Sequence, residues 1–215
     1  MKKIISVFLI VSMLFTTFMM GSCASRRAPK LEEIYDRVVE LIEASSEVNS
    51  IFYGEGLPYY DRTLSIYKEL YSDYTKVGYT KNYNIVSQQS KYQTIGAIKL
   101  AAEAVYSAEL LENSVYPSAF EGVIVPDIHT GVHSSDARYL ESNDDLYILI
   151  PSEEDHHPTP LIYDYSTMKI VKPSNATRVL ISITAWEEDR PALPIQTRIS
   201  LVLQDGVWML DSLTV

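Results

Sequence analysis

Two hydrophobic periodicities divide the chain, one with helical spacing and one with strand spacing. From Leu31 to Phe52, apolar residues recur at steps of three and four, which predicts an amphipathic helix with one buried face. Two glycines and a proline at 53–58 end this helix. A second helix is predicted within residues 94–120, with Thr94 as its N-cap and Pro117 beyond its end.

Residues 59–93 follow neither period cleanly. The portion from Leu64 to Tyr71 predicts a turn or two of helix. The segment "TKVGYTKNYNIV" at 75–86 is rich in aromatic and β-branched residues, which favours a pair of strands.

From residue 120 onward the pattern changes to period two. "ARYLESNDDLYILIP" predicts a hairpin that turns around Ser142 to Asp145. Strands are predicted in "LIYDYSTMKIVKPS", "ATRVLISITAWEE" and "IQTRISLVLQ", and Asp205-Gly206 predicts a type I′ turn into a terminal strand, "VWMLDSLTV". We therefore expect one α+β domain over 31–215, with two N-terminal helices packed on a C-terminal antiparallel β-meander sheet.

The first 22 residues have the layout of an export signal. Lys2 and Lys3 precede an apolar run from Ile4 to Met20, and the small residues Gly21 and Ser22 follow. A spanning helix wants about 20 apolar residues, so a cleaved signal is favoured over a permanent transmembrane segment.

Cys23 is the only cysteine of the chain, and it follows this signal directly. "Met20-Gly21-Ser22-Cys23" resembles the lipobox of bacterial lipoproteins. The resemblance implies cleavage between Ser22 and Cys23, an acyl lipid such as palmitate on the Cys23 sulfur, and a tether at 23–30. It places the protein outside the cytoplasm, anchored by lipid to the cell membrane or the outer membrane. The alternative is an ordinary secretion signal with an incidental cysteine.

The charge of the mature chain excludes one class of partner. Without Lys2 and Lys3, 16 of the 18 basic residues remain against 28 acidic ones, so the net charge changes from −10 to −12. Such a surface repels nucleic acid, and it suits a basic protein, a cation or simple solubility. With one cysteine, no intramolecular disulfide forms, so the core alone must hold the domain together.

Motifs of catalysis are absent from the sequence. There is no GxSxG and no HExxH, and the acidic pairs sit at predicted turns. The four histidines lie in "PDIHTGVH" and "PSEEDHHP", as His129, His133, His156 and His157. They allow a metal site in principle, but two solvated loops are the favoured interpretation. We expect no enzymatic activity and no cofactor.

Tyrosine is the compositional exception, with 16 residues in 215. A tyrosine buries its ring and keeps its hydroxyl wet, which suits binding surfaces as well as half-buried structural positions. The candidate binding surface comprises Tyr53, Tyr59, Tyr60 and Tyr106.

The order of elements resembles a known family. The helix "YQTIGAIKLAAEAVYS", the strand ending "MKIVKPS" and the final "LVLQDGVWMLDSL" are similar in order to IseA-type inhibitors of the DL-endopeptidases that cut bacterial peptidoglycan. The resemblance spans about residues 31–215 and implies a protein-binding domain that plugs a cell-wall hydrolase. It carries over no inhibitory residue, and those inhibitors are secreted rather than lipid-anchored.

The last strand pair also resembles NTF2-like and cystatin-like proteins. That resemblance implies the alternative function, a small-ligand or wall-glycan binding lipoprotein with a pocket between its helices and a curved sheet.

Overall fold

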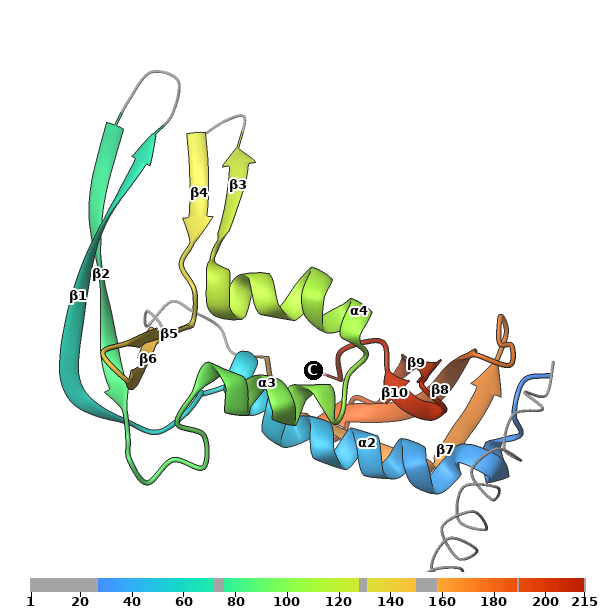
Figure 1. Ribbon diagram of the computed structural model, residues 1–215. Coiled ribbons are helices and arrows are strands. Elements are labelled where there is room, and N and C mark those ends of the chain that lie inside the picture. Colours follow the sequence, from blue (N-terminus) through green and yellow to red (C-terminus); the bar gives the residue numbers. More distant parts are fainter. Residues whose placement is uncertain (1–26, 72–75, 128–130, 150–157, 189, 215) are drawn as a thin grey trace, which may run out of the picture.

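A computed structural model of the protein describes residues 27–71, 76–127, 131–149, 158–188 and 190–214 (Figure 1). The predicted first helix is confirmed as α2, Leu31–Phe52. Its first turn carries two glutamates, and Glu33 accepts a hydrogen bond from the backbone N–H of Lys30 at 3.0 Å. The carboxylate thus satisfies one donor at the start of the helix and complements the helix dipole.

The second predicted helix is broken into several pieces. They are α3 (Ile95–Glu103), α4 (Ala108–Leu110) and two π-helical segments, η1 (Leu111–Val115) and η2 (Pro117–Glu121). The Thr94 cap is confirmed, since its hydroxyl accepts from the Ala97 N–H at 3.0 Å. The expectation that Pro117 lies beyond the helix is wrong, because a proline is tolerated at the first position of a new helical segment.

The break between α3 and α4 has a tertiary cause. The Ser107 N–H donates to the Leu210 carbonyl at 2.7 Å, and the Leu210 N–H donates to the Val105 carbonyl at 2.9 Å. These bonds form a parallel bridge between Tyr106 and Leu210, so the backbone there pairs with a strand instead of continuing the helix.

The C-terminal meander is confirmed. Strands β7 (Leu161–Val171), β8 (Arg178–Glu187), β9 (Ile195–Gln204) and β10 (Val207–Leu210) form an antiparallel sheet in the order β10-β9-β8-β7. The predicted turn between β9 and β10 has positive φ at both central residues, 51° at Asp205 and 83° at Gly206. That geometry is the one a type I′ turn requires.

A second sheet forms at the other end of the molecule. It contains β1 (Tyr59–Tyr71), β2 (Lys76–Val86), β5 (Tyr139–Ser142) and β6 (Asp145–Leu149) in the order β1-β2-β6-β5. The hairpin around 142–145 is confirmed. The helical prediction for Leu64 to Tyr71 is wrong, and 75–86 supplies one strand rather than two, because β1 and β2 pair with each other over almost their whole length.

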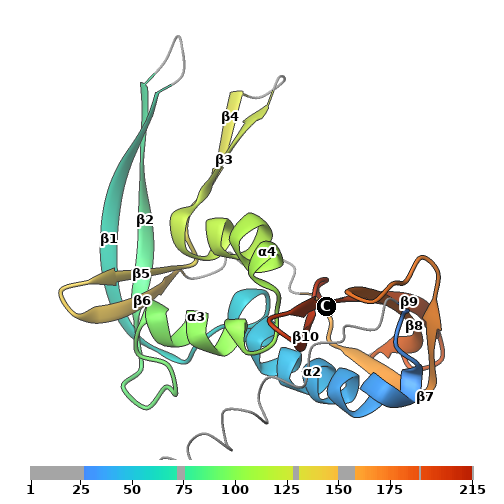
Figure 2. The same ribbon diagram turned by 45° about the vertical axis from the view of Figure 1, so that its right-hand side comes forward.

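The two sheets lie at opposite ends with the helical segments between them, and both views agree on this arrangement (Figure 1 and Figure 2). The hairpin β1–β2 and a smaller hairpin, β3 (Val123–Asp127) with β4 (Gly131–Ser135), project from the body. Helix α2 packs on β7 and β10, while α3 contacts both α2 and β5. The α+β class is therefore confirmed, and the helices join its two sheets.

The core lies mainly between α2 and the C-terminal sheet. The period-two side chains of β8 are fully buried at Val179, Ile181 and Ile183, and they face the apolar stripe of α2 that includes Val38 and Leu41. Burial of this kind stabilises by about 25 cal/mol per Å² of apolar surface removed from water. None of the helices in the described part of the chain is both long and apolar enough to cross a membrane.

Candidate functional site

A cavity of about 880 Å³ opens between the second half of α2 and the start of β7. Its lining comes from α2 and the residues just after it (42–55), from 158–165 and from Thr214. Sites for small ligands in proteins have volumes of about 300–1,000 Å³, so this cavity is of the right size for one.

Two polar residues interrupt the apolar stripe of α2 and form the base of the cavity. Ser45 and Asn49 are 1% and 7% exposed, and they sit four residues apart on the face that also buries Leu41 and Phe52. Residues at this spacing share a helix face, so both side chains point inward. Their position in an otherwise apolar stripe is a sequence signal that could have identified them.

Ser45, Asn49, Tyr106 and Thr214 form a buried hydrogen-bond network, named here the floor network. The Tyr106 hydroxyl donates to Asn49 Oδ1 at 2.6 Å, and Asn49 Nδ2 donates to Thr214 Oγ1 at 2.8 Å. Ser45 Oγ lies 2.6 Å from Thr214 Oγ1 and donates to the Ile42 carbonyl at 2.6 Å. Because the Ser45 hydrogen is given to Ile42, the Thr214 hydroxyl is the donor to Ser45. Each hydroxyl hydrogen of the network therefore has an acceptor inside the protein.

Aromatic side chains from two elements form the walls of the cavity. Tyr53 follows α2 directly, and Tyr163 and Tyr165 are two residues apart on β7, so these two share a face of the strand. Tyr163 donates its hydroxyl to the Thr214 carbonyl at 3.2 Å.

Burial moves the pKa values of these three phenols further above neutral pH. It raises the pKa of Tyr53 to about 12, with a smaller contribution from nearby Tyr106. Burial also raises the pKa of Tyr163 and of Tyr165, and the Glu43 carboxylate adds to the shift at Tyr165. The three aromatic rings of the lining are therefore uncharged at neutral pH, and the faces of such rings are electron-rich.

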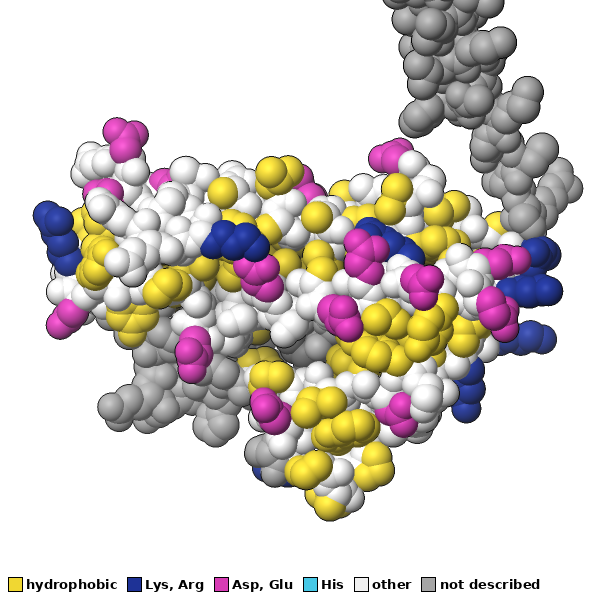
Figure 3. Space-filling model, turned by 90° about the horizontal axis from the view of Figure 1, so that it is seen from below, with side chains coloured by type: hydrophobic (Ala, Val, Ile, Leu, Met, Phe, Trp, Pro, Cys, Tyr) yellow, Lys and Arg dark blue, Asp and Glu magenta, His cyan; other side chains and the backbone are white. Residues whose placement is uncertain are grey.

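The rim of the cavity is acidic. Glu43 and Glu55 are solvent-exposed members of its lining, and no Lys, Arg or His occurs among the lining residues that the structure describes. Figure 3 shows the side of the molecule that carries α2, where acidic side chains are interspersed with hydrophobic ones. The field at the entrance consequently favours a neutral or positively charged ligand.

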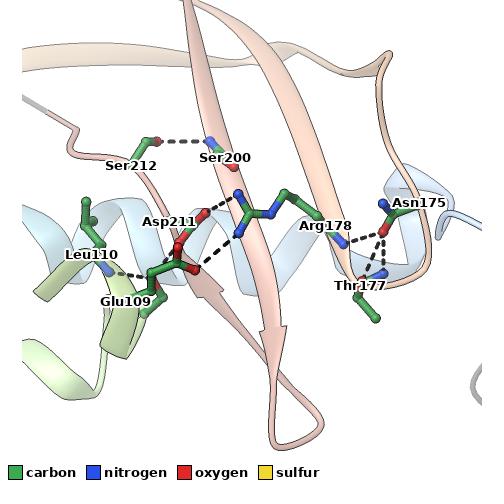
Figure 4. A network of polar contacts seen from close by, with 9 residues as sticks. Glu109, Leu110, Asn175, Thr177, Arg178, Ser200, Asp211 and Ser212 are labelled. Carbon is green, nitrogen blue, oxygen red and sulfur yellow. Dashed lines mark hydrogen bonds and ion pairs between the residues drawn. The ribbon is translucent and has the colours of Figure 1, made fainter. Parts of the chain in front are cut away.

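A polar network holds residues 211–214, the segment that ends with Thr214, and Figure 4 shows its contacts at Asp211 and Ser212. Arg178 pairs with Asp211 at 3.0 Å and approaches Glu109 at 3.6 Å, while the Ser107 hydroxyl donates to Asp211 at 2.6 Å. The backbone is held as well, because the Asp211 N–H donates to the Ser200 carbonyl at 2.7 Å. These contacts hold the segment that follows β10 against the sheet and α4. Thr214, at the end of this segment, thereby reaches Ser45 and Asn49 of α2.

The other end of the cavity is fixed by the hairpin that follows β4. Arg138 donates to the Gly54 carbonyl, and the Tyr139 hydroxyl donates to the Ile51 carbonyl at 2.9 Å. A cation at a helix C-terminus is favourable, the Tyr139 bond satisfies a carbonyl in the last turn of α2, and the Arg138 bond holds the chain two residues beyond the end of the helix. Gly56 has a φ of 81° and lies so close to Arg138 and Ile148 that a side chain would not fit. The chain from Tyr53 to Gly56 is therefore held in one path.

The predicted binding surface is divided between three places. Tyr53 lines the cavity, and Tyr106 is fully buried in the floor network beneath it. Tyr59 and Tyr60 lie on β1 in the other sheet, 43% and 46% exposed. The four tyrosines therefore do not form one surface, because residues 53 and 59 belong to different layers of the fold. Sequence reasoning missed Tyr163 and Tyr165, whose alternation was used only to predict a strand.

Several predicted positions lie outside the described residues. Ser22 and Cys23 precede the described chain, and His129, His156 and His157 fall in its gaps. His133 belongs to β4, where only the backbone path is described. Within the described part, no three His, Cys, Asp or Glu side chains come together in a way that could hold a metal ion.

Comparisons with known proteins found no matching protein-family model and no matching curated protein.

Proposed function

We propose that this protein is a membrane-anchored extracytoplasmic lipoprotein whose α+β domain is a non-enzymatic binding protein for a small ligand. The observation that carries the proposal is the cavity of about 880 Å³ between α2 and β7, with its three tyrosine walls and its buried polar floor. An apolar and aromatic lining with a few convergent polar groups is typical of ligand sites.

The arrangement of the floor network supports binding rather than catalysis. The Ser45 hydroxyl bonds to a backbone carbonyl and to Thr214, so no base among its hydrogen-bond partners would activate it as a nucleophile. The two described carboxylates of the cavity, Glu43 and Glu55, are solvent-exposed at its rim.

The proposed lipid anchor and the cavity lie at different positions along α2. The described chain begins beside the N-terminus of α2, at the end of the molecule that holds the C-terminal sheet (Figure 1). A lipid on Cys23 would hold this end near the membrane. The cavity lies at the second half of α2, farther along the helix from the tether.

The proposal can be tested by blocking the cavity. Ser46 is an exposed lining residue of α2, so Ser46→Trp would fill the space without breaking the floor network. Ala44 is also exposed on α2 but does not line the cavity, and Ala44→Trp is the matched control. The soluble domain from Ala24 to Val215 would be screened by thermal shift and calorimetry against a fragment library of neutral, anionic and cationic compounds.

We expect some fragments to bind the wild-type domain and Ala44→Trp but not Ser46→Trp. If no fragment binds in a manner that depends on Ser46, the proposed function is wrong. Crystals soaked with a binding fragment would place it against Tyr53, Tyr163 or Tyr165.

A second candidate function, binding of a cell-wall hydrolase or another envelope protein, is favoured by the projecting hairpin β1–β2. Its edge strand exposes Tyr59, Tyr60 and Tyr67, the last at 64%, and the hairpin lies at the end of the molecule away from the tether. Exposed aromatic residues on an edge strand suit protein docking.

This candidate has a separate test. The rate of peptidoglycan digestion by a DL-endopeptidase of the same organism would be followed with and without the domain. A dose-dependent slowing that is lost in the double variant Tyr60→Ala and Tyr67→Ala would support inhibition through the hairpin. An unchanged rate would exclude inhibition of the enzyme tested.

A further inference from the structure

We infer that the ligand of the cavity is an organic cation, a protonated amine or a quaternary ammonium group on a mostly apolar body. The inference rests on the proposed function and adds the chemical class of the ligand. Three features of the cavity support it: the charge of its rim, the aromatic faces of its walls and the lack of charge in its floor.

The charge at the rim selects against anions. Glu43 and Glu55 are the charged side chains of the described lining, and both are acidic, whereas Arg138 lies outside the lining and gives a hydrogen bond to the Gly54 carbonyl. The mature chain as a whole is also strongly acidic. A carboxylate or phosphate ligand would meet repulsion at the entrance and would find no cation in the described lining to compensate for its lost hydration.

The walls provide the surface that an organic cation prefers. The aromatic lining comes from two elements. Tyr53 follows the end of α2, and β7 carries Tyr163 and Tyr165. A cation over an aromatic face is attracted by the negative charge of the ring, and several such faces recognise quaternary ammonium groups. The Glu43 carboxylate lies near enough to Tyr165 to affect its titration, so a charge and a ring act on the same part of the cavity.

The floor network carries no charge. The hydroxyl hydrogens of Tyr106, Thr214 and Ser45 are already given to acceptors within the protein, and Asn49 Nδ2 gives one of its two hydrogens to Thr214. No group of the floor therefore supplies the positive charge that would compensate an anion for its lost hydration, whereas a quaternary ammonium group requires no hydrogen bond.

A bare metal ion fits the cavity less well. Hard divalent cations need six or more oxygen ligands at fixed short distances, and aromatic walls supply none. The described residues also contain no group of three metal-ligating side chains. The charge and the rings together therefore indicate a molecular cation.

The inference is tested with a pair of probes of nearly equal shape. Choline carries a quaternary nitrogen, and 3,3-dimethylbutan-1-ol has a neutral carbon in its place. Calorimetry with the soluble domain is expected to give choline an affinity at least tenfold higher than the neutral alcohol. Glu43→Gln is expected to weaken choline binding about threefold to tenfold and to leave alcohol binding unchanged. Glu40→Gln, at a position of α2 outside the cavity, is the matched control and should change neither.

Two results would overturn the inference in different ways. If neutral or anionic fragments bind in a manner that depends on Ser46 and choline binds no better than its neutral analogue, the cation selectivity is wrong and the proposed function stands. If no compound of any charge shows Ser46-dependent binding, both the inference and the proposed function are wrong.

Discussion

Tyr106 is the residue that ties the floor network to the break between α3 and α4. Its hydroxyl is the donor to Asn49 Oδ1, and both groups are buried. We expect Tyr106→Phe to leave that oxygen without its partner and to destabilise the protein by about 1–3 kcal/mol. Urea unfolding measures the loss. Tyr60→Phe, at an exposed ring, should change the free energy of unfolding by less than about 0.5 kcal/mol. Equal effects of the two substitutions would contradict the assignment.

At the residue scale, the sequence predicted which positions are buried better than what they contact. The inward pattern of Val179, Ile181 and Ile183 followed directly from alternation and is confirmed. Ser45 and Asn49 were visible as polar residues in an apolar stripe, but their partner Thr214 is 169 residues from Ser45. A contact at that separation depends on the tertiary arrangement of sheet and helix, and no local period encodes it.

At the element scale, the turn after α2 depends on Gly56. A Cβ at this position would lie 2.9 Å from Nη2 of Arg138 and closer still to Ile148, and φ is 81°. We expect Gly56→Ala to destabilise the protein by about 2–4 kcal/mol, from backbone strain and overpacking together. Gly206 has a φ of 83° and no atom within 4 Å of such a Cβ, so Gly206→Ala should cost only about 1 kcal/mol. Both variants carry the backbone strain, and Gly56→Ala alone carries the overpacking, so the difference between their thermal unfolding measures the overpacking. A larger loss of stability for Gly206→Ala than for Gly56→Ala would contradict the close packing around Gly56.

The wrong predictions at this scale have a common cause. Leu64, Tyr67 and Tyr71 fall at helical spacing by chance, and pairing with β2 decides their conformation as a strand. Likewise, the apolar stripe continues past Ala104, but Val105 and Ser107 use their backbone groups to pair with Leu210. In both places a non-local strand pairing overrides the local period, which single-sequence patterns do not contain.

At the scale of the whole molecule, buried tyrosines predict the response to alkaline pH. Burial raises the pKa above the ordinary value of 10 at Tyr53, Tyr106, Tyr116, Tyr139, Tyr163 and Tyr165. The unfolded chain therefore loses these protons first, so the contribution of the tyrosines to stability is fully present below about pH 9 and is lost as pH rises through 10 and above. Urea unfolding at pH 8, 9, 10 and 11, with absorbance at 295 nm to follow phenolate, checks the sign. A rise in stability from pH 9 to 11 would contradict it.

The proposed attachment to the membrane is a second point to test at the scale of the whole molecule. The proposed anchor depends on the Cys23 thiol, and acyl chains contribute about 0.8 kcal/mol per buried CH₂. We expect Cys23→Ser to abolish incorporation of labelled palmitate and to leave the signal uncleaved, so that the variant runs as a larger precursor on a gel, with Ser25→Ala as the control. Label that persists on Cys23→Ser, or normal processing of the variant, would argue against a lipid anchor at this residue.

The floor network has a consequence for the order in which the protein is made. A chain that leaves the ribosome and crosses a membrane N-terminus first presents α2 early, whereas Thr214 follows 169 residues after Ser45. Contacts at such separations close slowly, because loop entropy must be overcome before they form. If the chain is exported as proposed, the cavity has no floor until residues 211–214 have crossed the membrane. The proposed ligand site would then be completed only on the far side of the membrane, after the rest of the domain has been delivered there.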